Sequence, residues 1–286
     1  LLVAATVIFV VRGPAALQRP LQGLAQRVTS IGQSGGAKLQ VAGTAPSACM
    51  AYGPTGPSKN QTVFVDPGHG GADPGAMGQT SSGSQVLEKQ ATLAVAQALE
   101  GRLTDDGYRV VLSRTQDTLV ADGLGDSTLS VSDEIRDLQA RVDCANAAKA
   151  VALVSIHFNS FDNSSTGGTE TFYDDVRPFA AQNQVLAQDV QSALVRSLGL
   201  QNRGITSDDQ LNVPTTSGDG ASYGHLFLLG PPQAGLVARA SSMPGTLTEP
   251  LFVSEPTEAD LVTSGSGQQQ VADSIANGVE TFLQKR

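Results

Sequence analysis

Short apolar runs recur along the chain and alternate with longer amphipathic segments. The runs consist mainly of Val, Ile, Leu and Phe and are bounded by polar or turn-forming residues, a pattern typical of buried strands. They predict strands at residues 62–65, 109–113, 151–156, 168–173, 226–229 and 246–248.

The longer segments carry apolar residues every three or four positions, the spacing of one face of an α-helix. They predict helices at residues 88–106, 135–145, 186–198 and 271–282. Strands that alternate with helices indicate an α/β fold, in which helices cover both faces of the sheet. We therefore expect a single three-layer domain over residues 61–286, with a mostly parallel sheet flanked by helices.

Two regions lack a clear periodic pattern. Residues 12–60 contain scattered Gly, Pro, Ser and Gln, and we interpret them as a linker. Residues 202–223 are polar and rich in Gly, Ser, Thr and Asp, which is compatible with a mobile surface loop or with a hairpin near the site; we favour the loop.

The first 11 residues are almost entirely apolar and are followed by Arg12. A bilayer-spanning helix needs about 20 apolar residues, so residues 1–11 instead match the apolar part of a signal peptide or the remnant of an anchor. A buried helix or strand is the alternative. We favour export, to a secreted or periplasmic location, with membrane contact only through this segment.

Composition and net charge exclude some classes of function. Of 286 residues, 40% are hydrophobic and 16% are charged, which is ordinary for a globular protein, and the net charge is −9. An acidic chain without a basic cluster is poorly suited to nucleic acid. Cys49 and Cys144 are the two cysteines of the chain. In an exported protein we expect them to form a disulfide, whereas in the cytosol they would more often be free thiols.

Two of the three histidines follow predicted strands. His69 and His157 would meet at the carboxyl edge of a parallel sheet, and Glu88 opens the first long helix. Two imidazoles and a carboxylate that leave a coordination position open can hold a catalytic Zn²⁺. Glu249, at the end of a late strand, suits a general base and acid. Taken singly, each of these residues is more often structural, and His225 is expected not to be a ligand.

Two further polar residues lie beside the proposed ligands. Asp66 and Asn159 could orient the histidines through hydrogen bonds, although Asp66 could equally cap its own loop. Glu255 and Glu258 lie in a polar stretch and are interpreted as solvated loop acids.

Several motifs follow one another over about residues 62–283: Val63 to Ala76 with Asp66-Pro67-Gly68-His69-Gly70 inside it, Glu88-Lys89, Ser113-Arg114 with Asp117, Arg141 with Ala145-Asn146, Ser155-Ile156-His157-Phe158-Asn159, and Gly168 to Tyr173. Together, and in this order, they resemble the motifs of the zinc-dependent N-acetylmuramoyl-L-alanine amidases (type 3) of bacterial cell walls. The resemblance implies a Zn²⁺ held by His69, Glu88 and His157, with Glu249 as the catalytic acid. Leu247-Thr248-Glu249-Pro250-Leu251-Phe252 departs from the family's pattern after the glutamate.

The resemblance implies hydrolysis of the amide between N-acetylmuramic acid and L-alanine, in peptidoglycan or in its muropeptide fragments. We expect a monomer. A non-catalytic peptidoglycan-binding or regulatory module on the same fold is the main alternative, and a zinc peptidase that cleaves elsewhere in the stem peptide is another.

Overall fold

A computed structural model describes residues 36–125, 128–210, 215–216 and 222–286. The predicted signal or anchor segment, residues 1–11, lies outside the described residues, as do residues 12–35 of the predicted linker. Among the helices of the described ranges, none is both long and apolar enough to cross a membrane.

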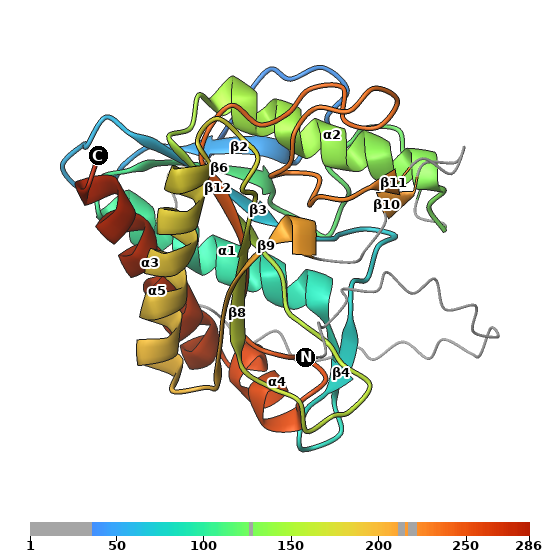
Figure 1. The fold of residues 1–286 in the computed structure, drawn as a ribbon, viewed down its shortest axis with the longest axis vertical. Coiled ribbons are helices and arrows are strands. Elements are labelled where there is room, and N and C mark those ends of the chain that lie inside the picture. The colour runs from blue at the N-terminus through green and yellow to red at the C-terminus, as the bar shows by residue number, and fades with distance from the viewer. Residues whose placement is uncertain (1–35, 126–127, 211–214, 217–221) are drawn as a thin grey trace.

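The chain forms one mixed eight-stranded sheet with helices on both faces (Figure 1). The strands are β1 (Ala37–Lys38), β2 (Ala48–Tyr52), β3 (Thr62–Pro67), β4 (Met77–Gln79), β5 (Gln85–Leu87), β6 (Arg109–Arg114), β7 (Ala152–Ile156), β8 (Thr169–Tyr173), β9 (Asn202–Ser207), β10 (Thr215–Thr216), β11 (Ser222–Tyr223) and β12 (Gly245–Glu249). The helices are α1 (Glu88–Asp105), α2 (Val131–Ala148), α3 (Ala180–Leu198), α4 (Pro256–Thr263) and α5 (Gly265–Gln284), with one 3₁₀ turn at Asp208–Gln210.

The main sheet has the order β1-β2-β6-β3-β7-β12-β8-β9. Its centre, β6-β3-β7-β12, is parallel, whereas β2 and β8 run antiparallel to their inner neighbours. The carboxyl ends of β3, β7 and β12 therefore meet at one edge, which is where open α/β sheets place their sites. The α/β prediction is confirmed.

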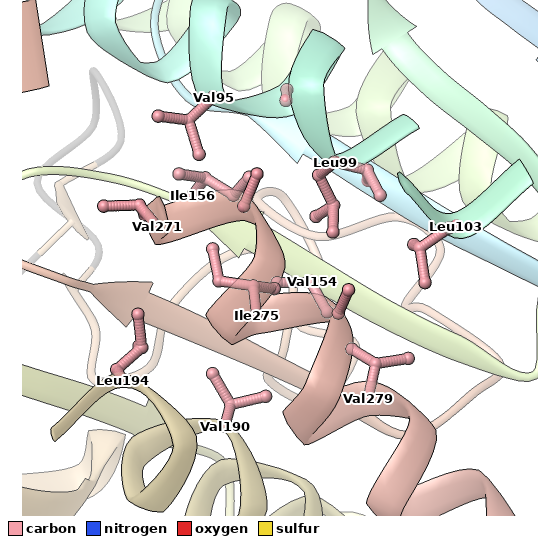
Figure 2. Packing of buried hydrophobic residues seen from close by; sticks show 14 of the residues in the cluster. Val95, Leu99, Leu103, Val154, Ile156, Val190, Leu194, Val271, Ile275 and Val279 are labelled. Atoms are coloured by element: carbon pink, nitrogen blue, oxygen red, sulfur yellow. The ribbon is translucent and has the colours of Figure 1, made fainter. Parts of the chain in front are cut away.

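Alternation along the strands directs apolar side chains to both faces of the sheet, where they form the two larger hydrophobic clusters. On β3, Val63 and Val65 face α1, α3 and α5, while Phe64 faces α2. Figure 2 shows the larger core, in which the apolar face of α5 lies between α1 and α3 and packs on β7. The residues labelled there are Val95, Leu99, Leu103, Val154, Ile156, Val190, Leu194, Val271, Ile275 and Val279.

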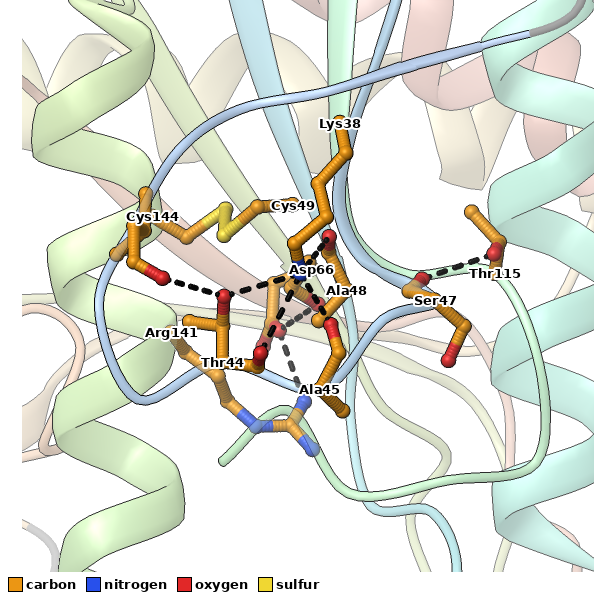
Figure 3. The surroundings of a disulfide bond; sticks show 12 residues. Lys38, Thr44, Ala45, Ser47, Ala48, Cys49, Asp66, Thr115, Arg141 and Cys144 are labelled. Carbon is orange, nitrogen blue, oxygen red and sulfur yellow. Dashed lines mark hydrogen bonds and ion pairs between the residues drawn. A yellow bond between two sulfur atoms is a disulfide. The ribbon is translucent and has the colours of Figure 1, made fainter. Parts of the chain in front are cut away.

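The predicted linker is wrong for part of its length. Strands β1 and β2 lie within residues 12–60 but extend the main sheet beyond β6. The predicted disulfide is present, with Cys49 of β2 bonded to Cys144 of α2 at a Cα–Cα distance of 5.6 Å. Figure 3 shows this bond beside Lys38, whose ammonium donates to the carbonyl oxygens of Thr44 and Ala45. A disulfide and a lysine together thus hold a segment whose sequence has little hydrophobic periodicity.

Two other sequence interpretations are also corrected. Residues 226–229 form a buried turn, with the N–H groups of Leu229 and Gly230 donating to the Leu226 carbonyl, rather than a strand. A short apolar run indicates that a segment is buried but does not by itself specify its backbone conformation. Residues 202–207, interpreted as part of a loop, form strand β9 at the sheet edge, and β10 and β11 form a separate hairpin.

Candidate metal centre

The loop after β3 presents His69 to the carboxyl edge of the sheet. The N–H of Gly68 still donates to the Ile156 carbonyl of the neighbouring strand, at 3.0 Å. His69 then adopts a left-handed backbone conformation, with φ of 61°, which turns the chain sharply out of the sheet. Its Nδ1 lies 2.7 Å from Asp73 Oδ2, so Nε2 is directed away from Asp73 and toward Glu88 and His157.

His157 and Glu88 complete a compact group with His69. His157 Nδ1 lies 3.0 Å from His69 Nε2, and Glu88 Oε1 lies 2.9 Å from His69 Nε2 and 3.1 Å from His157 Nδ1. Glu88 is fixed in place, because its Oε1 accepts from the Phe158 N–H and its Oε2 from the Ala76 N–H. The group brings three ligand atoms together as the sequence predicts, and it can hold a metal ion.

The spacing of these atoms fits a small divalent ion. Ligands at 2.0–2.2 Å from a tetrahedral centre lie about 3.3–3.6 Å from one another, a few tenths of an ångström more than the separations of 2.9–3.1 Å observed. Two glycines leave room for this arrangement. A Cβ on Gly68 would lie 2.3 Å from the His157 ring, and a Cβ on Gly75, which has φ of +64°, would lie 2.7 Å from both Glu88 and His69.

The pKa values of His69 and Glu88 reflect opposite charges that are paired in a buried site. Burial opposes ionisation of Glu88, but His69 and His157 outweigh it and hold the pKa of that carboxyl well below its usual range. Burial likewise opposes protonation of His69, whereas Glu88 and Asp73 raise its pKa to about 10. The surroundings of the group thus favour a positive charge between these side chains, which is the charge that a metal ion would supply.

Glu249 ends β12 at the same edge of the sheet and is 2% exposed. Burial raises its pKa well above the usual value, and Glu88 and Glu170 raise it further. Glu170 is its direct partner across the β8–β12 pair and was not singled out from the sequence as a site residue. Within the described residues, Glu249 Oε2 has no hydrogen-bond partner, so this oxygen is free to exchange a proton.

The residues predicted to orient the histidines have other roles. Asp66 accepts from Ser113, Ser155 and Arg141, and no hydrogen bond to a histidine is recorded for it in the described part of the chain. Asn159 accepts from the Ser160 N–H through its side chain and is bonded to Leu251 and Val253 through its backbone.

The orienting residue is Asp73, four positions after His69 in the same loop. Its position inside the quoted motif was a signal that the sequence interpretation did not use.

Glu255 and Glu258, interpreted from the sequence as solvated loop acids, both differ from that expectation in the structure. Glu258 is 7% exposed rather than solvated, and its two oxygens accept from the N–H groups of Gly168 and Phe252. Glu255 caps α4 by accepting from the Glu258 N–H. His225 lies outside the His69–Glu88–His157 group, and together with Asp174 and Asp208 it forms a second group that could hold a metal ion.

A His–Glu–His group beside a buried carboxylate, at the carboxyl edge of an α/β sheet, has the composition of a hydrolase site able to hold a metal ion. The family described as N-acetylmuramoyl-L-alanine amidase matches residues 63–281, and the chain belongs to that family.

Known proteins agree with this assignment. The chain is 30% identical over 226 residues to the N-acetylmuramoyl-L-alanine amidase LytC of Bacillus subtilis, a match that covers 79% of this chain and 36% of LytC. The chain thus spans about a third of that relative.

Two solved structures share the fold. An N-acetylmuramoyl-L-alanine amidase from Clostridium difficile 630 is 30% identical, with a TM-score of 0.57, covering 80% of this chain and all of that one. The CwlD amidase of Clostridioides difficile, solved in complex with the GerS lipoprotein, is 25% identical, with a TM-score of 0.61, covering 79% of this chain and all of that one.

Proposed function

We propose that this chain is a zinc-dependent amidase that hydrolyses the bond between the lactyl group of N-acetylmuramic acid and L-alanine in peptidoglycan or its fragments. The observation that carries the proposal is the convergence of His69, Glu88 and His157 on one point, with ligand atoms 2.9–3.1 Å apart. Family membership supports the substrate class, and the cell-wall relatives support action outside the cytoplasmic membrane.

The donor set suits Zn²⁺, which would be held by His69 Nε2, Glu88 Oε1 and His157 Nδ1. When bound, zinc supplies a Lewis acid that polarises the scissile carbonyl and acidifies the attacking water. The fixed partners of Glu88, the N–H groups of Phe158 and Ala76, keep this carboxylate in position throughout the reaction.

Glu249 moves the proton. Its free Oε2 accepts a proton from the attacking water and passes it to the amide nitrogen as the carbon–nitrogen bond breaks, so that the L-alanine amine leaves neutral. A raised pKa suits both halves of this task, because the carboxyl must hold the proton between the two steps. Glu88 and Glu170 raise that pKa through their negative charges.

The test is mass spectrometry of the products from purified muropeptides. Hydrolysis at the proposed bond yields a free muramic acid lactyl carboxyl and a stem peptide that begins with the L-alanine amine, and a chelator abolishes both. Intact muropeptides would favour a non-catalytic module, and peptides cut beyond L-alanine would favour a zinc peptidase.

Glu249→Gln is the matched variant. It should retain fold and metal, because Glu249 is not among the three ligands, and should lose about 10²–10⁴-fold in turnover. Glu255→Gln is the control: it weakens the cap of α4 and should leave turnover near that of the wild type. Full activity of Glu249→Gln would remove Glu249 from the mechanism.

A further inference from the structure

A second cluster of side chains that could hold a metal ion lies at the opposite end of the central strands. Asp174 directly follows β8, and Asp208 directly follows β9. Since β8 and β9 are parallel neighbours, these two aspartates meet at the same end of the strands. His225 reaches them from the segment after β11.

This cluster is separate from the site already described. Strand β8 runs antiparallel to β12, and Glu170 pairs with Glu249 in that register. Asp174 lies four residues further along the β8 direction, roughly 13 Å away at the rise of an extended strand. The cluster therefore cannot share an ion with His69, Glu88 and His157.

Its geometry repeats that of the first group. His225 Nδ1 lies 3.1 Å from Asp174 Oδ2 and 3.2 Å from Asp208 Oδ1, compared with 2.9–3.1 Å between the ligand atoms of the first group. Both aspartates are fully buried, and the His225 side chain is 19% exposed.

The other carboxylate oxygens are already engaged. Asp174 Oδ1 accepts from the N–H groups of Val176 and Arg177, and Asp208 Oδ2 accepts from the Leu226 N–H. These bonds fix both carboxylates so that one oxygen of each is directed at His225. The site is thus rigid before any ion is bound.

Hydrogen bonding within the cluster leaves one atom unsatisfied. An imidazole Nδ1 carries at most one proton, and the bond to Asp208 uses it. Asp174 Oδ2 then has no hydrogen-bond partner among the described residues, although it is buried. The guanidinium of Arg177 does not bond to this oxygen, because it donates to the carbonyl oxygens of Leu229, Gly230 and Ser241.

We propose that Asp174, Asp208 and His225 bind a second divalent cation, which joins the ends of β8 and β9 to the segment that follows β11. Two carboxylate oxygens and one imidazole nitrogen are donors that Zn²⁺ and Mn²⁺ accept, and a buried pair of carboxylates needs such a charge. The ion would hold Leu226 and the buried turn after it against the sheet, a structural role that is independent of catalysis.

The metal content of the protein tests this proposal. After dialysis against Zn²⁺ and removal of the free metal, elemental analysis should find two equivalents in the wild type. His225→Ala and Asp208→Asn should each contain one, His157→Ala should contain one, and the double variant His157→Ala/His225→Ala should contain none. Asp209→Asn, at the exposed neighbour of Asp208, is the control and should contain two.

A single equivalent in the wild type that disappears in His157→Ala would overturn the proposal, as would two equivalents in His225→Ala. The two sites fail separately: if the His69–Glu88–His157 group binds no metal, His157→Ala should still contain one equivalent, and the added change His225→Ala should remove it.

Stability gives a second readout that does not require activity. Metal-stripped His157→Ala should gain about 5–10 °C in melting temperature at a hundredfold excess of Zn²⁺ over its dissociation constant. The same addition should leave His157→Ala/Asp208→Asn unchanged. An equal gain in both variants would show that the ion binds elsewhere and would reject the cluster as a site.

Discussion

Asp66 Oδ1 lies 2.8 Å from Arg141 Nη1, and both residues are almost completely buried under the loop that carries His69. Burial alone would raise the pKa of Asp66, but Arg141, with Ser113 and Ser155, holds it below the usual value. Arg141 also donates to the carbonyl oxygens of Pro67 and His69. The pair therefore fixes the backbone of the ligand loop rather than the imidazole itself.

Removing the guanidinium should destabilise the protein strongly. Arg141→Met leaves Asp66 and Asp137 buried without their partner, which costs about 3–5 kcal/mol of the free energy of unfolding in comparable cases. Urea denaturation measures the loss. Arg136→Met, at a 57% exposed side chain of the same helix, is the control and should change stability by less than about 0.5 kcal/mol. Similar midpoints for the two variants would contradict a structural role for the buried pair.

Asp73 should control metal affinity through His69. Asp73→Asn replaces the carboxylate that bonds to Nδ1, which weakens the orientation and basicity of the ligand and should lower zinc affinity about 10–100-fold. Competition with a chromogenic chelator measures the affinity, and Asp162→Asn, at an exposed site, is the control. Unchanged affinity in Asp73→Asn would show that the ring is held by packing alone.

Glu258 should be structural, contrary to its position in a polar stretch. Glu258→Ala leaves the buried N–H groups of Gly168 and Phe252 without acceptors, at a cost of about 2–4 kcal/mol. Equilibrium unfolding measures the stability of this variant and of the control Asp260→Ala, from an exposed position on α4. The buried acid should cost stability on removal, whereas the exposed acid should not. Equal stability of both variants would restore the interpretation of Glu258 as solvated.

Glu100 should make stability depend on pH. Burial raises its pKa to about 7, and Asp105 adds to the effect. The pKa of Glu100 in the unfolded chain is near 4.3, so between about pH 4.3 and pH 7 the folded state binds more protons than the unfolded state. The contribution of Glu100 to the free energy of unfolding therefore falls as pH rises through this window.

Glu100→Gln should therefore raise the melting temperature at pH 8, by the equivalent of about 1–3 kcal/mol, and have little effect at pH 4. Thermal unfolding at both pH values is the measurement. A gain of the same size at pH 4 would point to a cause other than ionisation.

The disulfide should contribute to stability because it closes a long loop. Cys49 and Cys144 are 95 residues apart, for which loop entropy gives about 4–5 kcal/mol as an upper figure. The double variant Cys49→Ser/Cys144→Ser should lose about 2–5 kcal/mol by denaturant unfolding. Thiol titration of the unfolded, unreduced wild type should find no free thiol, and two free thiols would contradict the bond.

Several features could be predicted from the sequence alone because their signals are local. The strands before His69 and His157 are continuous apolar runs, and the helices carry apolar faces of regular spacing. Parallel strands place their carboxyl ends together, so His69 and His157, which each follow a predicted strand, could be expected to meet there. The two cysteines offered one possible intramolecular pair.

Other features depend on contacts between distant segments. Strands β1 and β2 pair with the sheet beyond β6 and are further held by a disulfide and a lysine, contacts that leave no hydrophobic period in the sequence, so this segment resembles a linker. Glu258 is buried and accepts from the N–H groups of Gly168 and Phe252, and the first of these donors lies 90 residues away, so the polar sequence around Glu258 gives no sign of it.

Asp174, Asp208 and His225 are 34 and 17 residues apart along the chain. The pairing of β8 with β9 brings the two aspartates together, and the segment after β11 brings His225 to them. Local sequence determines which segments are buried and in what conformation, because burial and backbone preference act over a few residues. Tertiary structure decides which polar side chains share one buried place, because each buried charge or N–H group must find its partner wherever the fold provides one.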